Sequence, residues 1–268
     1  MLNPSKRGTQ MPASPIRKLV PFADRAKQRG ITVHHLNIGQ PDLETPPAAM
    51  AAVKNTNISI LAYSHSAGNL SYREKLVHYY AKNGISVEAN NILITAGGSE
   101  AIVFAFMACL DPGDEIIVPE PFYANYNGFA VMAGANVVPV TSLIEKGFEL
   151  PDPEQFESVI TPKTKAILIC NPNNPTGYVY SRQELEKLEE ICLKHQLFLF
   201  ADEAYREFSY GAPCFSAMQL EKIPEQVILM DTISKRYAAC GARIGAFVTR
   251  NKLVFDAAMK FAQARLSP

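Results

Sequence analysis

One lysine, Lys235, follows the apolar run VILMDTIS and precedes small residues, in the segment DTISKRYAACGARIGAFVT between Asp231 and Thr249. Most lysines in turns are solvated. A lysine held in apolar surroundings is costly to keep charged, so its pKa falls and its amine becomes a usable nucleophile. The segment therefore offers two interpretations of Lys235, a solvated turn residue or a buried nucleophile.

Polar or glycine-rich segments follow five apolar runs of the chain. NILIT runs into AGGSE, EIIVP into EPFYANY, KAILIC into NPNNPTG, LFLF into ADEAY, and VILMD into TISK. If the runs are parallel strands of one open sheet, ligands bind at their carboxyl ends. We therefore expect these five segments to meet at one edge of a sheet.

Two of these segments could bind a phosphate group. AGGSEAI is a glycine turn entering a helix, where free backbone N–H groups and the helix dipole attract anions, although such turns are often glycine-rich for steric reasons alone. Thr232 and Arg243 flank Lys235 and could add phosphate contacts. A solvent-facing Arg243 is the alternative.

Three further segments supply polar groups of other kinds. Asp202 ends an apolar strand, where a buried carboxylate usually has a cationic partner or caps the next helix. Tyr205 lies one helical turn later, and NPNNPTG either presents an asparagine or is a tight surface loop. A lysine, a phosphate site, an aspartate and a tyrosine suggest Schiff-base chemistry. Pyridoxal 5'-phosphate combines the aldehyde, phosphate, phenolic oxygen and basic ring nitrogen that these groups would bind.

The rest of the chain predicts an α/β fold in which helices cover a buried sheet. Helices are expected over 71–84 and 181–195, each opening with a Ser-x-x-Glu capping box. Apolar runs without polar alternation indicate strands buried on both faces. We expect a three-layer α/β/α fold with a mostly parallel seven-stranded sheet, with strands at residues 91–95, 115–119, 136–140, 165–170, 197–203, 227–232 and 243–249.

Composition favours small-molecule chemistry. The 26 basic residues balance the 26 acidic ones, so no net field favours nucleic acid or an anionic membrane. Five widely spaced cysteines fit reduced thiols, no CxxC pair suggests zinc, and adjacent His34 and His35 would point to opposite faces of a strand. The longest apolar run, AIVFAFMACL, is half of a bilayer span, and the start MLNPSKRGTQ lacks a signal peptide's apolar segment. We expect a cytoplasmic protein that binds no metal.

Taken together, these segments resemble the class I/II aminotransferases of the fold-type I pyridoxal-phosphate enzymes, near the aspartate aminotransferase branch. The resemblance runs from Leu36 to Gly245 and rests on seven motifs in order: LNIGQPD, YSHSAGNLSYREKL, TAGGSEAI, EPFYANY, NPNNPTG, ADEAY and SKRYAACGARIG. It implies the fold type I large domain and pyridoxal phosphate as cofactor.

The resemblance also implies a role for each residue that matches a family motif. Lys235 would form the Schiff base and move the proton between substrate and cofactor, and Asp202 would pair with the protonated ring nitrogen. Tyr205 would act with Asn174 on the phenolic oxygen. The remaining assignments are Tyr123 on the ring face, Gly98, Ser99, Thr232 and Arg243 on the phosphate, Gly39 and Asn174 on the substrate, and Tyr63 on the phosphate of a neighbouring subunit in a homodimer.

The expected reaction is transfer of an amino group between an L-amino acid, aspartate or a broader set, and a 2-oxo acid. A pyridoxal-phosphate-dependent β-eliminating lyase and a non-catalytic binding module on the same fold stay open, although no basic helix-turn-helix segment precedes residue 40. Residues 1–43 are expected to form an N-terminal arm and part of a small domain, and residues 44–268 the large domain. The family's C-terminal small domain, with an arginine for the substrate carboxylate, has no counterpart, so we expect a C-terminally truncated chain.

Overall fold

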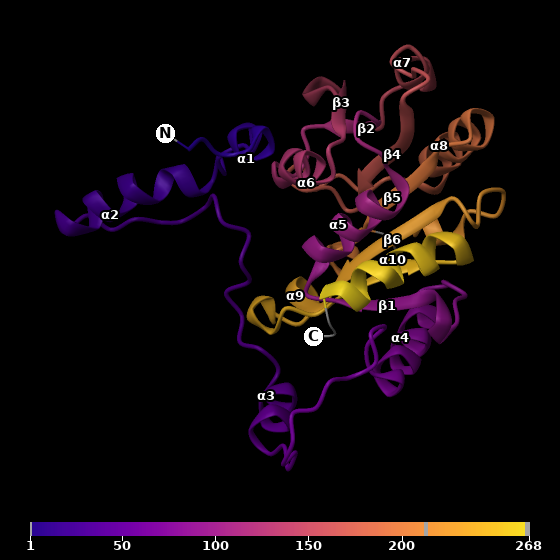
Figure 1. Cartoon of the computed structure of the whole chain (residues 1–268). Coiled ribbons are helices and arrows are strands. Elements are labelled where there is room, and N and C mark those ends of the chain that lie inside the picture. The colour runs from indigo at the N-terminus through magenta and orange to yellow at the C-terminus, as the bar shows by residue number, and fades with distance from the viewer. Residues whose placement is uncertain (1, 212–213, 266–268) are drawn as a thin grey trace.

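The architecture is a single twisted sheet covered by helices on both faces (Figure 1). The structure is a computed structural model that describes residues 2–211 and 214–265. These residues form a seven-stranded sheet in the order β1-β7-β6-β5-β4-β2-β3, in which β7 is antiparallel to both its neighbours and all other pairs are parallel. The strands are β1 Ile92–Thr95, β2 Glu115–Glu120, β3 Asn136–Thr141, β4 Thr164–Cys170, β5 Phe198–Asp202, β6 Val227–Thr232 and β7 Gly245–Thr249. The predicted seven strands and mostly parallel sheet are confirmed.

The helices follow the predicted alternation with the strands, with one correction at a helix start. Ser181 and Glu184 form the predicted capping box, with Ser181 Oγ accepting from Glu184 N at 3.2 Å. The other predicted box is wrong, because its helix begins at Leu70 with Asn69 as N-cap and Ser71 lies inside the first turn. The helices are α1 Lys6–Gln10, α2 Val20–Gln28, α3 Pro47–Lys54, α4 Leu70–Lys82, α5 Gly98–Cys109, α6 Asn125–Ala133, α7 Pro153–Glu157, α8 Arg182–His195, α9 Ile233–Arg236 and α10 Lys252–Arg265.

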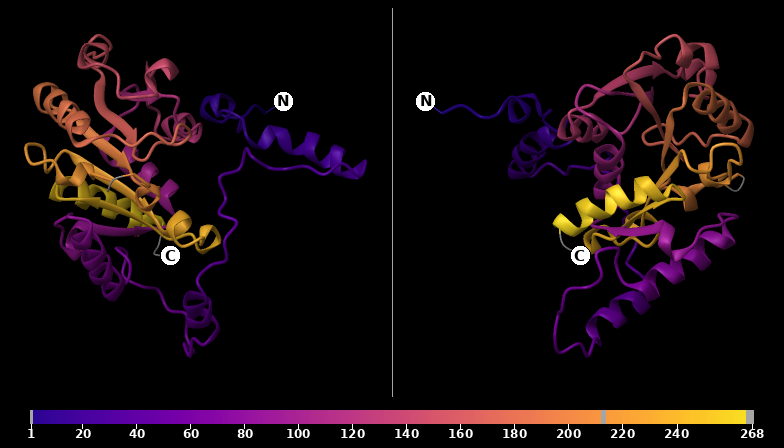
Figure 2. Two further views of the ribbon diagram at one scale, coloured as in Figure 1. Left: turned by 180° about the vertical axis from the view of Figure 1, so that it is seen from behind. Right: turned by 45° about the vertical axis from the view of Figure 1, so that its right-hand side comes forward.

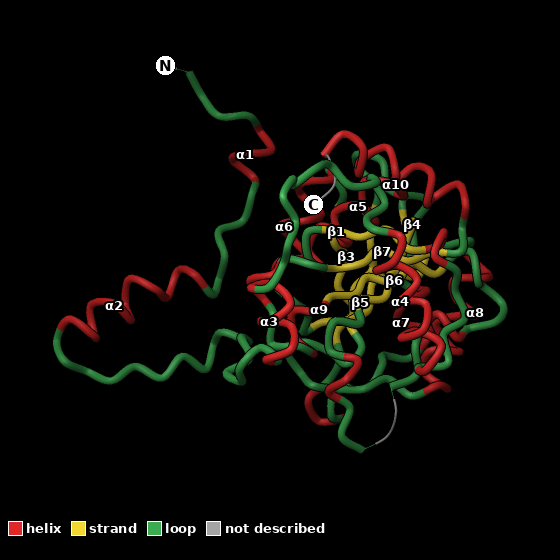
Figure 3. The backbone as a smooth tube through the Cα atoms, turned by 90° about the horizontal axis from the view of Figure 1, so that it is seen from below, coloured by secondary structure: helices red, strands yellow, loops and turns green. Residues whose placement is uncertain are grey.

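Two apolar cores, one on each face of the sheet, hold the three layers together. Figure 3 shows the strands enclosed by the surrounding helices. Helices α4, α7 and α8 pack on one face, and α5, α6 and α10 on the other. Successive strand residues point to opposite faces, so Ile94 belongs to the first core and Leu93 to the second. Burial on both faces explains why the strands are apolar throughout, since each side chain meets a helix rather than water.

The carboxyl ends of β1, β2, β4, β5 and β6 lie along one edge of the sheet, hereafter the functional edge. The antiparallel strand β7 brings its first residue to the same edge. Because it runs opposite to the others, its first residue Gly245 pairs with Thr95 and Thr232, the last residues of β1 and β6. The segment that precedes β7, including Arg243, therefore lies beside the carboxyl ends of the parallel strands. This edge carries every strand-end segment that the sequence singled out.

The N-terminal segment, residues 2–66, lies largely outside this compact body (Figure 2). None of its described residues is buried, and the first buried positions are Ala67 and Gly68. It touches the body where Thr45 Oγ1 donates to the carbonyl oxygen of Ala238 at 2.7 Å. Within the described ranges, every helix is too short or too polar to cross a membrane.

Candidate functional site

Lys235 lies on α9, a single helical turn directly after β6. Thr232 caps this turn, its hydroxyl oxygen accepting from Ser234 N at 3.2 Å. Lys235 Nζ donates to the carbonyl oxygen of Gly39 at 2.8 Å and lies 5.9 Å from the ring centroid of Tyr205. The side chain is only partly exposed. Lys235 thus lies between the two interpretations, a solvated turn residue and a buried nucleophile, and its amine is held by a specific contact at this edge.

Asp202, the last residue of β5, is a buried carboxylate. Its oxygens accept hydrogen bonds from the Tyr126 hydroxyl at 2.8 Å and from Ala204 N at 3.2 Å. Burial raises the pKa of this carboxyl to about 6, and the two hydrogen bonds oppose the rise. The described residues place no lysine or arginine in an ion pair with it. The expected cationic partner is thus not supplied by this part of the chain.

Aromatic side chains line the space near Asp202. Tyr123 packs edge-on against Tyr126, with ring centroids 5.5 Å apart, and its hydroxyl accepts from Asn125 Nδ2 at 2.7 Å. Burial raises the pKa of Tyr205 to about 12. A methyl group added to Gly39 would lie 3.6 Å from the Tyr205 hydroxyl, so Gly39, Tyr205 and Lys235 are neighbours.

Tyr126, the side chain that donates to Asp202, is not among the residues predicted from the sequence. It belongs to the segment EPFYANY and lies in the first turn of α6, whereas Tyr123 precedes that helix. The spacing within EPFYANY gave no signal for this contact, because Tyr123 and Tyr126 do not share a helix. The partner on a different strand was not visible from that spacing.

The glycine turn between β1 and α5 is packed tightly against Arg243. Gly97 caps the helix with φ 85°, a conformation that L side chains rarely adopt, and an added Cβ there would collide with the Arg243 guanidinium. Arg243 Nη2 donates to the carbonyl oxygen of Ala96 at 3.1 Å. An added Cβ on Gly98 would lie 3.5 Å from the Thr232 side chain. The N-terminus of α5, the Thr232 side chain and the Arg243 guanidinium therefore surround one small region.

Of the remaining predicted residues, Ser99 and Asn174 lie at the functional edge, whereas Tyr63 lies outside it. Ser99 follows Gly98 in the first turn of α5. In the NPNNPTG loop, Asn173 Oδ1 accepts from Thr176 N at 3.2 Å, within the loop itself. Asn171 bonds backbone groups outside the loop, donating to Phe215 O at 3.1 Å and accepting from Tyr180 N at 3.0 Å. The described contacts give Asn174 no side-chain hydrogen bond. Tyr63 is 85% exposed on the N-terminal segment, with no described contact to the other candidates.

Residues 31–268 match the aminotransferase class I and II family. The chain is 34% identical to aspartate/prephenate aminotransferase of Thermus thermophilus over 90% of its own length and 63% of the relative's. It is 35% identical to the putative aminotransferase YugH of Bacillus subtilis over 95% of its own length and 65% of that relative's. The chain therefore spans less than two thirds of the length of these relatives.

Solved structures give the same result for the fold. Aspartate aminotransferase from Thermus thermophilus, solved with maleate, superposes with a TM-score of 0.90 at 34% identity, covering 100% of this chain and 70% of that one. Alanine aminotransferase from Pyrococcus furiosus gives a TM-score of 0.91 at 34% identity, covering 99% of this chain and 70% of that one. The three-layer architecture is that of aspartate aminotransferase, and this chain belongs to the aminotransferase class I and II family.

Proposed function

We propose that this chain binds pyridoxal 5'-phosphate and that the whole protein transfers an amino group between an L-amino acid and a 2-oxo acid. Aspartate, or a broader set that includes it, is the proposed amino acid. The observation that carries the proposal is the buried carboxylate of Asp202, to which the described residues give no cation, at the same sheet edge as the partly exposed Lys235. Family membership and the names of the relatives support it.

The residues at this edge fit the cofactor at both of its ends. The Gly97–Gly98 turn, the Thr232 hydroxyl and the Arg243 guanidinium would hold the phosphate, since backbone N–H groups and a planar guanidinium suit phosphate oxygens. Asp202 would face the ring nitrogen, whose positive charge replaces the missing cationic partner. Ser99 would add its backbone N–H to the phosphate site, as proposed for Gly98.

Between these ends, side chains of the chain would orient the ring. Tyr123 would lie on a ring face, and Asn174 would donate to the phenolic oxygen, for which its side chain is free of described bonds. Because burial raises the pKa of Tyr205 to about 12, its hydroxyl keeps its proton at neutral pH and acts there as a donor. When bound, pyridoxal phosphate supplies an aldehyde that joins amines and a ring that accepts an electron pair.

Two residues carry the proposed chemistry of the chain itself. A cation near Asp202 lowers the pKa of this carboxyl from about 6, so the carboxylate stays charged and fixes a proton on its partner. Lys235 Nζ, next to the Gly39 carbonyl, can hold a proton or accept one from a substrate bound against the Gly39 backbone. These are the proposed electrostatic and proton-transfer roles.

We further propose a homodimer in which Tyr63 reaches the phosphate site of the second subunit. The support is the exposed apolar surface of the N-terminal segment, which includes Phe22, Leu36 and Leu61. The division at residue 43, between an arm with part of a small domain and the large domain, stays part of this proposal. The five free cysteines support a cytoplasmic location. The relatives named above are aminotransferases, so they give the lyase and binding-module alternatives no support.

The proposal is tested by attaching pyridoxal phosphate covalently to the chain and identifying the modified lysine. The chain is incubated with pyridoxal phosphate, reduced with borohydride, digested and analysed by mass spectrometry. We expect the added mass on the peptide that contains Lys235, and its loss in Lys235→Ala but not in the control Lys163→Ala. Fixation spread over surface lysines would refute the proposal. With a full-length protein, aspartate should yield its 2-oxo acid and aminated cofactor, whereas pyruvate and ammonia from a cysteine-like substrate would indicate elimination.

A further inference from the structure

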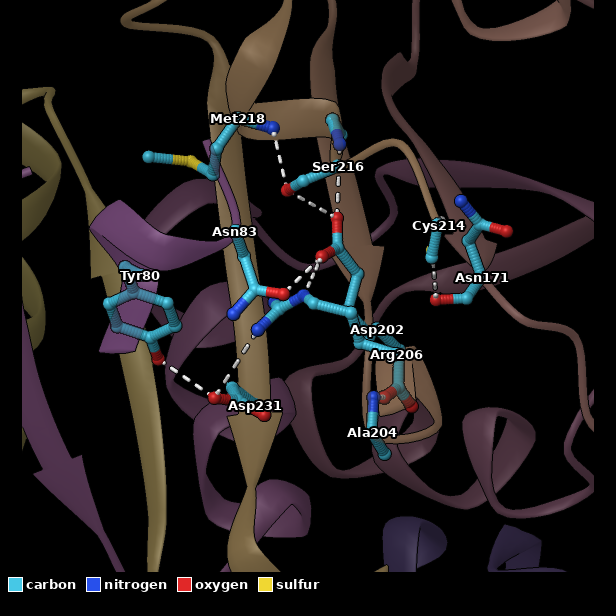
Figure 4. Close-up of polar contacts among 12 residues, drawn as sticks. Tyr80, Asn83, Asn171, Asp202, Ala204, Arg206, Cys214, Ser216, Met218 and Asp231 are labelled. Carbon is cyan, nitrogen blue, oxygen red and sulfur yellow. Dashed lines mark hydrogen bonds and ion pairs between the residues drawn. The ribbon is translucent and has the colours of Figure 1, made fainter. Parts of the chain in front are cut away.

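A buried network of charged side chains adjoins the turn that carries Lys235, and Figure 4 shows part of it, with Arg206 and Asp231 beside Tyr80. Its members, hereafter the charge network, are Glu203, Arg206, Asp231 and Arg236. Their side chains are between 0% and 6% exposed, so water screens their interactions little. Two acidic and two basic groups balance, and none of them belongs to the cofactor site proposed above.

Asp231 is the centre of the charge network. Its Oδ1 accepts from Arg236 Nη1 at 2.7 Å and from the backbone N of Thr232 at 2.7 Å. Its Oδ2 accepts from the Tyr80 hydroxyl at 2.9 Å and again from Arg236 Nη1 at 3.0 Å. One carboxylate thus holds the residue that caps α9 and the residue that ends it.

Helix α9 needs such an anchor because it is too short to be stable alone. It has four residues, Ile233–Arg236, and one turn of helix is unfavourable without tertiary contacts. Consecutive helical residues point about 100° apart. Arg236 turns back to Asp231 and stacks 4.3 Å from the ring centroid of Tyr79, while Lys235 reaches Gly39.

The charge network also attaches to the strand that carries Asp202. Glu203 follows Asp202 directly, and its carboxylate accepts from Arg206 Nε at 2.8 Å and from Ser216 Oγ at 2.8 Å. Arg206 Nη1 lies 3.9 Å from Asp231 Oδ2 and so connects the ends of β5 and β6. Asp202 directly precedes Glu203, and Lys235 directly precedes Arg236. Both residues proposed to act on the cofactor are therefore covalent neighbours of the charge network.

We propose that Asp231 and Arg236 are positioning residues, whose buried ion pair fixes α9 so that Lys235 is presented to the functional edge. That the placement of Lys235 matters for catalysis rests on the proposed function. The positioning itself is a property of the chain and is measured without cofactor.

Two readouts on the full chain test it. Hydrogen exchange followed by mass spectrometry reports the opening of the peptide 232–237, with α8 as internal reference. Reductive methylation with formaldehyde and cyanoborohydride reports the reactivity of Lys235 relative to the exposed Lys163, whatever the cofactor does. Lys252→Met is the matched control, since it removes an exposed ion pair with Asp256 on α10 and leaves α8 untouched.

In Arg236→Met we expect exchange of 232–237 to rise about tenfold or more with α8 unchanged, and Lys235 methylation to approach the rate of Lys163. Arg236→Lys keeps a charge for Asp231 and should restore much of the native behaviour. Should Arg236→Met fail to fold, Asp231→Asn combined with Arg236→Met removes both charges, a change that buried pairs often tolerate, and should show the same local opening.

Two results would overturn the inference. One is native exchange and native Lys235 reactivity in the folded double variant, which would make the pair irrelevant to α9. The other is an equal rise of exchange in α8, which would mean that the pair serves global stability alone. A native chain that fails to fix pyridoxal phosphate refutes the proposed function and leaves both readouts interpretable.

Discussion

The hydroxyl of Tyr126 donates a hydrogen bond to Oδ2 of Asp202, with the two oxygens 2.8 Å apart. Tyr126 is fully buried, and helix α6 holds it against the end of β5. The bond favours the charged carboxylate, and burial opposes it. The protonation state of Asp202 is therefore sensitive to the charge of a ligand bound beside it, and a cation favours the carboxylate.

Replacing Tyr126 by Phe should weaken cofactor binding without unfolding the chain. The lost hydrogen bond raises the pKa of Asp202 further above about 6, so less carboxylate is present at pH 7. A bond to a charged group contributes about 1.5–3 kcal/mol, so affinity for pyridoxal phosphate should fall about tenfold or more. Titrations between pH 6 and 9 should show affinity recovering at higher pH. Tyr178→Phe, which removes a tyrosine bond to Glu184 at 2.9 Å, should leave the profile native.

Replacing Asp202 by Asn should stabilise the cofactor-free chain above pH 6. The folded pKa is raised to about 6 from 3.8, so Asp202 contributes most to stability below the unfolded value, and that contribution is lost as pH rises through the folded value. This rise in pKa lowers the stability of the folded chain at neutral pH by about 3 kcal/mol. Urea unfolding should show the variant's advantage growing from pH 4 to 7 and then levelling. A difference between variant and native chain that does not change with pH would contradict the raised pKa of Asp202.

The close approach of β7 to the glycine turn predicts a strong effect of one methyl group. A Cβ on Gly245 would lie 2.5 Å from the carbonyl carbon of Gly97 and 2.7 Å from Gly98 N, and backbone cannot move aside cheaply. Gly245→Ala should lower the free energy of unfolding by about 1–3 kcal/mol and weaken phosphate-dependent cofactor binding. Gly241→Ala, which meets nothing within 4 Å, is the control and should stay within about 0.5 kcal/mol of the native chain.

Arg243 should act through the phosphate group alone. In Arg243→Ala we expect affinity for pyridoxal phosphate to fall about ten- to a hundredfold, because charge-assisted bonds to the phosphate are lost. Binding of pyridoxal, which lacks the phosphate, should change less than about twofold. Fluorescence titration with both compounds measures the contrast. Equal losses for both would show that Arg243 supports the turn through its bond to Ala96 rather than binding phosphate.

Local sequence patterns were sufficient to predict the strands and most of the segments at the functional edge. The doubly buried strands, the Ser181 capping box and the segments after each strand are local patterns, and the structure has them where they were expected. The Ser71 box failed because helix starts are set by the chain that precedes them, here the turn before Asn69. Lys235 is less buried than its apolar run indicated, since that run describes β6 and not the turn after it.

The sequence by itself determined the fold class, the family and the residues that lie at the functional edge, because strand periodicity and ordered motifs are written along the chain. Only the tertiary structure decided which side chains meet. Tyr126 with Asp202, Tyr80 with Asp231, and Arg243 with the Gly97 turn are contacts between separate elements. Such pairs depend on strand order and helix placement, and no local spacing records them.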